Sequence, residues 1–234
     1  MLMAIFCFLE GRRLFNACYL CRLAIQPMSE FNKKEIPFER VIFFSDAIVA
    51  IAITLLALDL KINVPESQPL SFKDLISPWH QYIAFQLSFI SIAGFWHTHH
   101  NFFIHIKKMD EKIFYLNIAW LFFIVTLPFS TSVLSSHFGS SAAVCLYSTN
   151  FLMLAIFQNS IWDYADGKAN YIHRENLDPK YLRDMRWMLN LDMLNALIAV
   201  TVSFFMPKTA FFLLFFKIPI LLFVPFVFRK GRRR

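Results

Sequence analysis

Six apolar segments of bilayer-spanning length constrain the fold of this chain more than any other feature. They cover residues 41–60, 79–103, 113–134, 141–162, 187–206 and 209–228. A transmembrane helix needs about 20 mostly apolar residues. The connections between the segments are mostly short and polar. The sequence therefore predicts an all-α integral membrane protein with six transmembrane helices in each chain.

The composition supports this class and excludes several others. Hydrophobic residues make up 57% of the 234 residues and charged residues 17%, against about 45–50% and about 25% in soluble domains. A soluble protein of this size could not cover its surface with so few polar side chains. Disordered, collagen-like and disulfide-scaffold classes are also excluded by this composition.

The positive charges predict how the chain lies across the membrane. If the N-terminus is cytoplasmic, 19 of the 23 Lys and Arg residues fall on the cytoplasmic side, Lys217 falls inside the sixth segment, and Lys61, Lys73 and Lys208 fall outside. This bias follows the positive-inside rule and places both termini in the cytoplasm. It also explains the net charge of +7 without a nucleic-acid partner. The basic tail, residues 229–234, is expected to touch anionic lipid.

The first residues do not fit a membrane span. Residues 1–9 are apolar but too short to cross a bilayer, and Arg12 and Arg13 follow them, whereas a signal peptide carries its charge first. We interpret residues 1–27 either as a loose extension or as upstream translation from a wrong start codon, in which case they are not native. Residues 28–39 then form a cytoplasmic lead-in to a six-span domain at 40–228.

Neither the cysteines nor the histidines indicate a metal enzyme. Cys18 and Cys21 form a CxxC pair, but no second pair completes a zinc site. Four histidines lie together near the end of the second segment: His97, His99, His100 and His105. A membrane di-iron site needs several such clusters, and the remaining histidines are single. Motifs of serine hydrolases and nucleotide-binding loops are absent, so we expect no enzyme, metal site or cofactor.

The first apolar segment carries the sharpest pattern. At about 100° per residue, Asp46 lies about 120° from Arg40, so each needs a partner on another helix. Opposite Asp46 runs an aliphatic seam with the 3, 4, 3, 4 spacing of a heptad: Ile48, Ile51, Leu55, Leu58 and Ile62. Ala50 and Ala57 lie on the Asp46 side, which we expect to pack within the subunit. The seam either faces lipid or core, or lines a dry pore where several copies meet at an axis.

A family resemblance enters at this same segment. The pattern Arg40-x-x-x-Phe44-Ser45-Asp46 resembles the RxxxFSD signature of the transmembrane protein 175 family of lysosomal and bacterial potassium channels. The second segment ends in WHTHHNFF, similar to the WxxHH segment of that family, with Trp96, His99 and His100. Asn117, Trp120 and the run LPFSTSVL at 127–134 also resemble it. The motifs cover residues 38–134.

This resemblance implies a homotetramer with six spans per chain and a pore lined by the first helices. It implies a pore constriction of aliphatic rings at Ile51, Leu55 and Leu58, flanked by Ile48, Thr54 and Ile62, with K⁺ as the permeating ion. The motif residues Arg40, Phe44, Ser45 and Asp46 are then structural. Their expected partners are Trp96, His99, His100 and Asn117.

Three other interpretations remain open. Asp46 could be an ion or proton site, although it points away from the seam. A secondary ion-coupled transporter would use the polar residues of the fifth segment, Asn190, Asp192 and Asn195, and a sixth helix broken by Pro219 and Pro225. A membrane scaffold without transport is also possible. We predict a potassium-preferring cation channel, multi-pass in the cell membrane, whose partners are sibling subunits, the bilayer and monovalent cations.

Overall fold

The protein is helical throughout its described part. The computed structural model describes residues 38–62, 64–65, 67–174 and 177–216. Its helices are α2 (Phe38–Leu55) with the 3₁₀ turn η2 (Leu56–Asp59), α3 (Phe72–Ile76), α4 (Trp79–His105), α5 (Glu111–Ser136), α6 (Ser141–Gly167), α7 (Pro179–Ser203), and α8 (Pro207–Leu213) with η4 (Leu214–Phe216). This confirms the predicted all-α class.

Long helices occupy the positions of the first five predicted spans. Within the described residues, Phe38–Asp59, Glu111–Ser136 and Ser141–Gly167 are long and apolar enough to cross a membrane. The second and fifth segments form α4 and α7, which are equally long but carry more polar side chains. The sixth segment begins as a shorter apolar helix, Pro207–Phe216, and its remainder lies outside the described residues. The count of six spans stays a prediction.

Local sequence signals set where the helices begin. Asp110 caps α5, because its side chain accepts a hydrogen bond from the backbone amide of Ile113. Asp178 caps α7 in the same way and is followed by Pro179 at the first helical position. Gly139 has a φ of +87° in the turn between α5 and α6, a conformation that favours glycine. These short turns place consecutive helices side by side.

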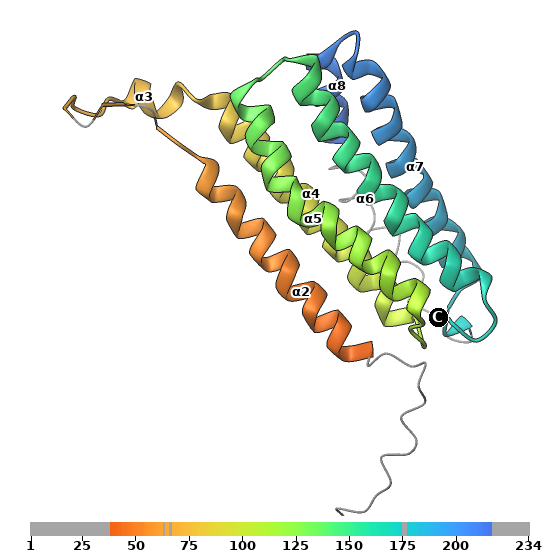
Figure 1. Cartoon of the computed structure of the whole chain (residues 1–234). Helices are drawn as coiled ribbons and strands as arrows, with labels where there is room; N and C mark the ends of the chain where they lie inside the picture. The colour runs from red at the N-terminus through yellow and green to blue at the C-terminus, as the bar shows by residue number, and fades with distance from the viewer. Residues whose placement is uncertain (1–37, 63, 66, 175–176, 217–234) are drawn as a thin grey trace, which may run out of the picture. The chain divides into compact units, whose positions relative to one another are not determined.

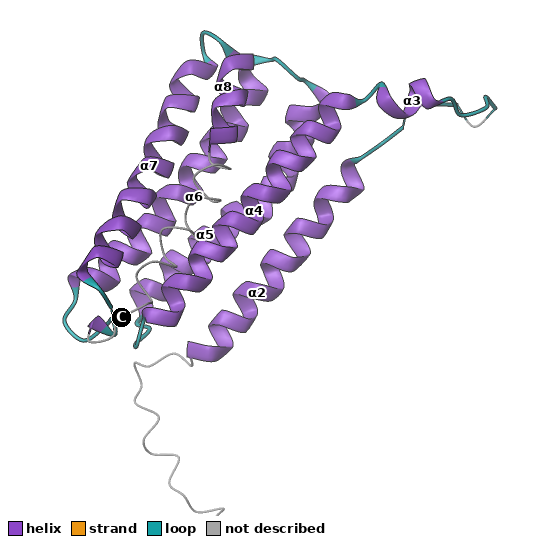
Figure 2. Ribbon diagram, turned by 180° about the vertical axis from the view of Figure 1, so that it is seen from behind, coloured by secondary structure: helices purple, strands orange, loops and turns teal. Residues whose placement is uncertain are grey.

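The helices α4 to α8 surround a core built largely from aromatic rings. Figure 1 shows α6 between α5 and α7, and Figure 2 shows the same helices from behind. The largest fully buried side chains include Trp120, Trp162, Tyr147 and Phe95. Phe102 packs on Trp162 with ring centroids 5.0 Å apart. Apolar packing of this kind, with several buried hydrogen bonds between the helices, fixes their relative positions.

Helix α2 packs on α4 and α5 through one face only. Its buried residues are Val41, Ser45, Val49, Ala52 and, in η2, Leu56. Ala50 and Ala57 are exposed, so the prediction that they lie on the packed face is wrong. The packed face is centred near Ser45 instead of Asp46, a turn of about 100°. Ser45 is small and finds a buried polar partner on α5, whereas the charged Asp46 stays half-exposed.

Candidate functional site

A buried hydrogen-bond chain joins three helices at the FSD motif. The Ser45 hydroxyl accepts from Asn117 Nδ2 on α5 at 2.9 Å and donates to the Val41 carbonyl at 2.8 Å. Asn117 Oδ1 in turn lies 2.7 Å from His99 Nε2 on α4. Because an amide oxygen only accepts, Nε2 of His99 carries the proton of this bond. Ser45, His99 and Asn117 are all buried.

Aromatic rings hold His99 in place. Its imidazole is stacked on Trp120, with centroids 4.3 Å apart and planes 14° apart. On α4 it also contacts Phe103 at 4.4 Å. The ring is therefore fixed by packing as well as by Asn117, and the three-helix contact is rigid. This arrangement is what a structural role for the motif requires.

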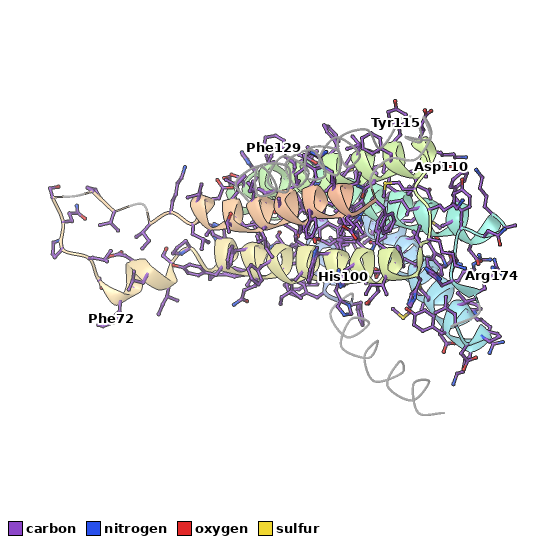
Figure 3. The ribbon with its side chains drawn as sticks, turned by 90° about the horizontal axis from the view of Figure 1, so that it is seen from below. Phe72, His100, Asp110, Tyr115, Phe129 and Arg174 are labelled. Carbon is purple, nitrogen blue, oxygen red and sulfur yellow. The ribbon has the colours of Figure 1, made fainter. Side chains whose placement is uncertain are left out.

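Asp46 makes a separate contact with α4. Trp96 Nε1 donates to Asp46 Oδ1 at 2.8 Å, near the protein surface. His100 stacks on the same indole ring, with centroids 5.5 Å apart and planes 25° apart, and its side chain lies on the outer surface of α4 (Figure 3). The indole links Asp46 to His100, so the structure brings all four expected partners together around Ser45 and Asp46.

Arg40 and Phe44 do not join this cluster within one chain. Arg40 is exposed and makes no ion pair with any residue in the described part. Phe44 is also exposed. The RxxxFSD pattern therefore divides into Ser45 and Asp46, which contact α4 and α5, and two residues whose side chains reach outward from the subunit.

The aliphatic seam of α2 has no covering element among the described residues. The exposed fractions are 59% for Ile51, 40% for Leu55 and 71% for Leu58. Thr54 is also exposed, and its hydroxyl donates to the Ile51 carbonyl at 2.8 Å. Ile48 is half-buried against the core. The middle of the seam is thus available to another molecule.

The heptad pattern assumed an α-helix as far as Ile62, but the α-helix ends before Leu58. Helix α2 ends at Leu55, residues 56–59 form a 3₁₀ turn, and Leu60 is extended. Residues three apart eclipse one another in a 3₁₀ helix, so Leu58 stays in line with Leu55. Ile62 is exposed beyond the turn and leaves the helical register. The three expected ring residues therefore remain on one line, and Ile62 does not continue it.

Asp110, at the start of α5, lies at the centre of a polar cluster that was not predicted from the sequence. Its Oδ2 accepts from Tyr164 Oη at 2.6 Å, Tyr171 Oη at 3.1 Å and Lys168 Nζ at 3.1 Å. Burial works to raise the pKa of Asp110, but these donors and its capping contact outweigh it and lower the pKa to about 2. The ammonium of Lys168 also lies over both tyrosine rings, and contact with Tyr164 and Asp110 raises its pKa.

Two further sets of contacts hold the connection between α6 and α7 near the Asp110 cluster. Asp166 accepts from Arg174 at 2.6 Å and from Arg186 at 2.7 Å. Ile106 and Ile172 form an isolated antiparallel bridge between the α4–α5 and α6–α7 connections. In the sequence, the only signal of this cluster is the position of Asp110 as a cap before an apolar run. Its partners lie more than 50 positions later, so no short motif joins them to it.

The polar residues of the fifth segment are partly engaged in helix packing. Asn159 on α6 donates to Asn190 Oδ1 on α7 at 3.1 Å. Asp192 and Asn195 are half-buried. Among the described residues, no three His, Cys, Asp or Glu side chains form a group that could hold a metal ion.

The residues that form the contacts described above match a known protein family. The model of the family described as "Endosomal/lysosomal potassium channel TMEM175" matches residues 40–128. A potassium channel of Chamaesiphon minutus is 36% identical over 132 residues, which is 54% of this chain and 64% of that protein. The endosomal/lysosomal proton channel TMEM175 of Gallus gallus is 30% identical over 67% of this chain and 33% of its own length. The chain thus spans just under two thirds of the bacterial relative and one third of the animal one.

The fold agrees with the same assignment. The crystal structure of a lysosomal potassium-selective channel TMEM175 homolog from Chamaesiphon minutus superposes with a TM-score of 0.67 and 27% identity. The superposition covers 80% of this chain and 96% of that one. The matched residues 40–128 include the signature, the seam, and the partners of Ser45 and Asp46. Residues 40–128 of the chain thus match the TMEM175 family, a family of membrane ion channels and not of enzymes, and the fold matches that of a TMEM175 homolog.

Proposed function

We propose that this protein is a homotetrameric, potassium-preferring cation channel whose pore is lined by α2. The observation that carries the proposal is the aliphatic line of Ile51, Leu55 and Leu58, which is exposed on a helix that packs on its own subunit through one face. Four such helices around one axis would cover this line with copies of itself. Relatives named potassium channels support the ion.

The mechanism follows from the chemistry of the seam. The side chains of Ile51, Leu55 and Leu58 offer a passing cation no oxygen ligands, so the cation must keep or shed its water at a cost. The Thr54 hydroxyl lies beside this face. It donates its hydrogen to the Ile51 carbonyl, and the lone pairs of its oxygen therefore remain available to a passing ion. Selectivity for K⁺ over Na⁺ should therefore be modest. Dewetting of the rings supplies the gate.

The motif cluster has a supporting role in this proposal. Ser45 and Asp46 hold α2 against α5 and α4 through Asn117 and Trp96. With one face of α2 fixed in this way, the seam is presented outward at a defined angle. The proposal also includes six spans per chain, with both termini in the cytoplasm, in the cell membrane.

In the proposed tetramer, we expect Arg40 to find its partner on a neighbouring subunit. It is exposed at the start of α2, and the half-exposed Asp46 on the same helix lies about 120° away from it. A transporter is less favoured, because the Asn190 side chain is engaged by Asn159 in a contact between α6 and α7.

Flux through liposomes tests the proposal. Purified protein is reconstituted, and ⁸⁶Rb⁺ uptake driven by a K⁺ gradient is compared with uptake driven by a Na⁺ gradient. A channel gives passive flux that does not saturate at millimolar ion and is larger for K⁺. Saturable uptake that requires a coupling ion would favour the transporter.

A further inference from the structure

The connection between α2 and α4 presents large apolar side chains away from the helices. Phe72 is 85% exposed, Ile76 70% and Leu70 57%. In Figure 3, Phe72 lies at one end of the molecule, and Asp110 and Arg174 lie at the other. Exposed apolar side chains that cluster in one short segment mark a contact with another phase or another molecule.

These side chains lie on one face of a well-formed helical turn. At about 100° per residue, Phe72 and Ile76 of α3 lie about 40° apart, with Leu75 on the same side. Asp74 lies on the opposite side, and Lys73 lies at the edge of the apolar face, about 60° from Ile76. A capping box fixes the turn: Ser71 Oγ accepts from the Lys73 amide, and Asp74 Oδ2 accepts from the Ser71 amide at 3.0 Å. The apolar face is therefore a structured surface and not a chance exposure of loop residues.

The turn is attached to the beginning of α4. The Tyr82 hydroxyl donates to the Leu75 carbonyl at 2.6 Å. Only Ser77 and Pro78 separate α3 from Trp79, the first residue of α4. Three residue steps reach about 10 Å at most, so α3 lies at the depth where α4 begins. Figure 1 shows α3 beside this end of α4 and beyond the end of α2.

Aromatic side chains indicate the depth in the membrane at which α4 begins. Trp79 packs edge-on against Phe138 with centroids 5.5 Å apart, and His80 adjoins both rings. Trp79 is half-exposed. Tryptophan gathers at the membrane–water interface, where its ring is amphipathic enough to lie among the headgroups. The start of α4, and α3 with it, therefore lies at the boundary between headgroups and acyl chains.

We infer that α3, with Leu70 before it, is a shallow membrane anchor whose Phe72 and Ile76 side chains insert into the interfacial layer of the bilayer. The charged side chains of Lys73 and Asp74 turn to headgroups and water. The anchor sits on the connection between α2 and α4, so it limits movement of the end of α2 that carries Leu58. It depends on the membrane location of the family but not on the proposed pore.

Collision measurements on spin labels test the anchor. All four cysteines are replaced, and a nitroxide is placed at Phe72→Cys or at Ile76→Cys in phosphatidylcholine and phosphatidylglycerol liposomes. The anchor predicts frequent collisions with oxygen, which dissolves in lipid, and few with a water-soluble nickel chelate. Gln68→Cys, exposed in the same connection, is the matched control and should show frequent nickel collisions.

Two results would overturn the anchor. Nickel access at both Phe72 and Ile76 equal to that at Gln68 would place α3 in water. Protection of both labels from oxygen and nickel alike would show that a second copy of the chain covers this face. Potassium flux measured in the same liposomes separates the two proposals, since a lipid-exposed label without flux would count against the channel alone.

Discussion

The side-chain amide of Asn117 donates to the hydroxyl of Ser45 at 2.9 Å, joining α5 to α2 across 72 positions of the sequence. The same amide binds His99 through its oxygen, so one side chain completes two buried contacts. A seam on α2 can line a pore only if another face of that helix is held; the Ser45 face lies about 100° from the seam, and this contact holds it.

Replacing Asn117 with Ala should loosen α2. The change leaves Nε2–H of buried His99 without its acceptor and Ser45 with only its bond to the Val41 carbonyl, at a cost of about 1–3 kcal/mol. We expect a lower melting temperature of the purified protein and a smaller fraction of assembled oligomer. The control is Asn101→Ala, because Asn101 makes only a 3.4 Å contact with His97 on the same helix. Equal melting temperatures for the two variants would contradict a supporting role for Asn117.

Trp96→Phe separates the structural role of Asp46 from a role in permeation. Phenylalanine keeps a ring against His100 but removes the Nε1 donor to Asp46. We expect a loss of stability of about 1 kcal/mol, less assembled oligomer, and an unchanged ratio of K⁺ to Na⁺ flux per assembled channel. A fully assembled protein with a changed ion ratio would instead make Asp46 part of the ion path.

Asp110 should make stability depend on pH in acid. Its pKa falls from 3.8 to about 2 in the folded protein, so the folded state binds fewer protons than the unfolded state in this range. The stabilisation is complete above about pH 4 and is lost as the pH falls towards 2. Melting curves between pH 2 and 6 should show this decline, and Asp110→Asn should flatten it.

Tyr164→Phe sharpens that test. It removes the 2.6 Å donor to Asp110, so the folded pKa of Asp110 should rise towards its unfolded value, and the decline should become smaller and end at a higher pH. Tyr115→Phe, the same change at an exposed tyrosine, is the matched control. If both variants kept the decline of the unchanged protein, the Asp110 cluster would not stabilise the fold.

The sequence predicted the helices well because apolar length is a local property. It also placed Ile51, Leu55 and Leu58 on one face, since that face depends only on the helical repeat. It misplaced Ala50 and Ala57, because the choice of packed face depends on Asn117, a residue on another helix. The register of Ile62 was lost for a different reason, namely the change to a 3₁₀ turn after Leu55.

The Asp110 cluster could not be predicted for a physical reason of the same kind. Its donors Tyr164, Lys168 and Tyr171 lie on the α6–α7 side of the chain, and only the packing of α5 on α6 brings them to Asp110. Charged and aromatic residues in a polar connection have many possible partners. Pairing across helices follows from the three-dimensional arrangement and leaves no spacing pattern in the sequence.

Modification of single cysteines tests most directly whether the seam lines the pore. In a cysteine-free background, Leu55→Cys should conduct K⁺ and lose its current when a water-soluble, positively charged methanethiosulfonate is added, and K⁺ should slow the reaction. Phe129→Cys, exposed on α5, is the control and should keep its current. A Leu55→Cys channel that conducts and is not blocked, although its thiol reacts, would contradict a pore lined by α2.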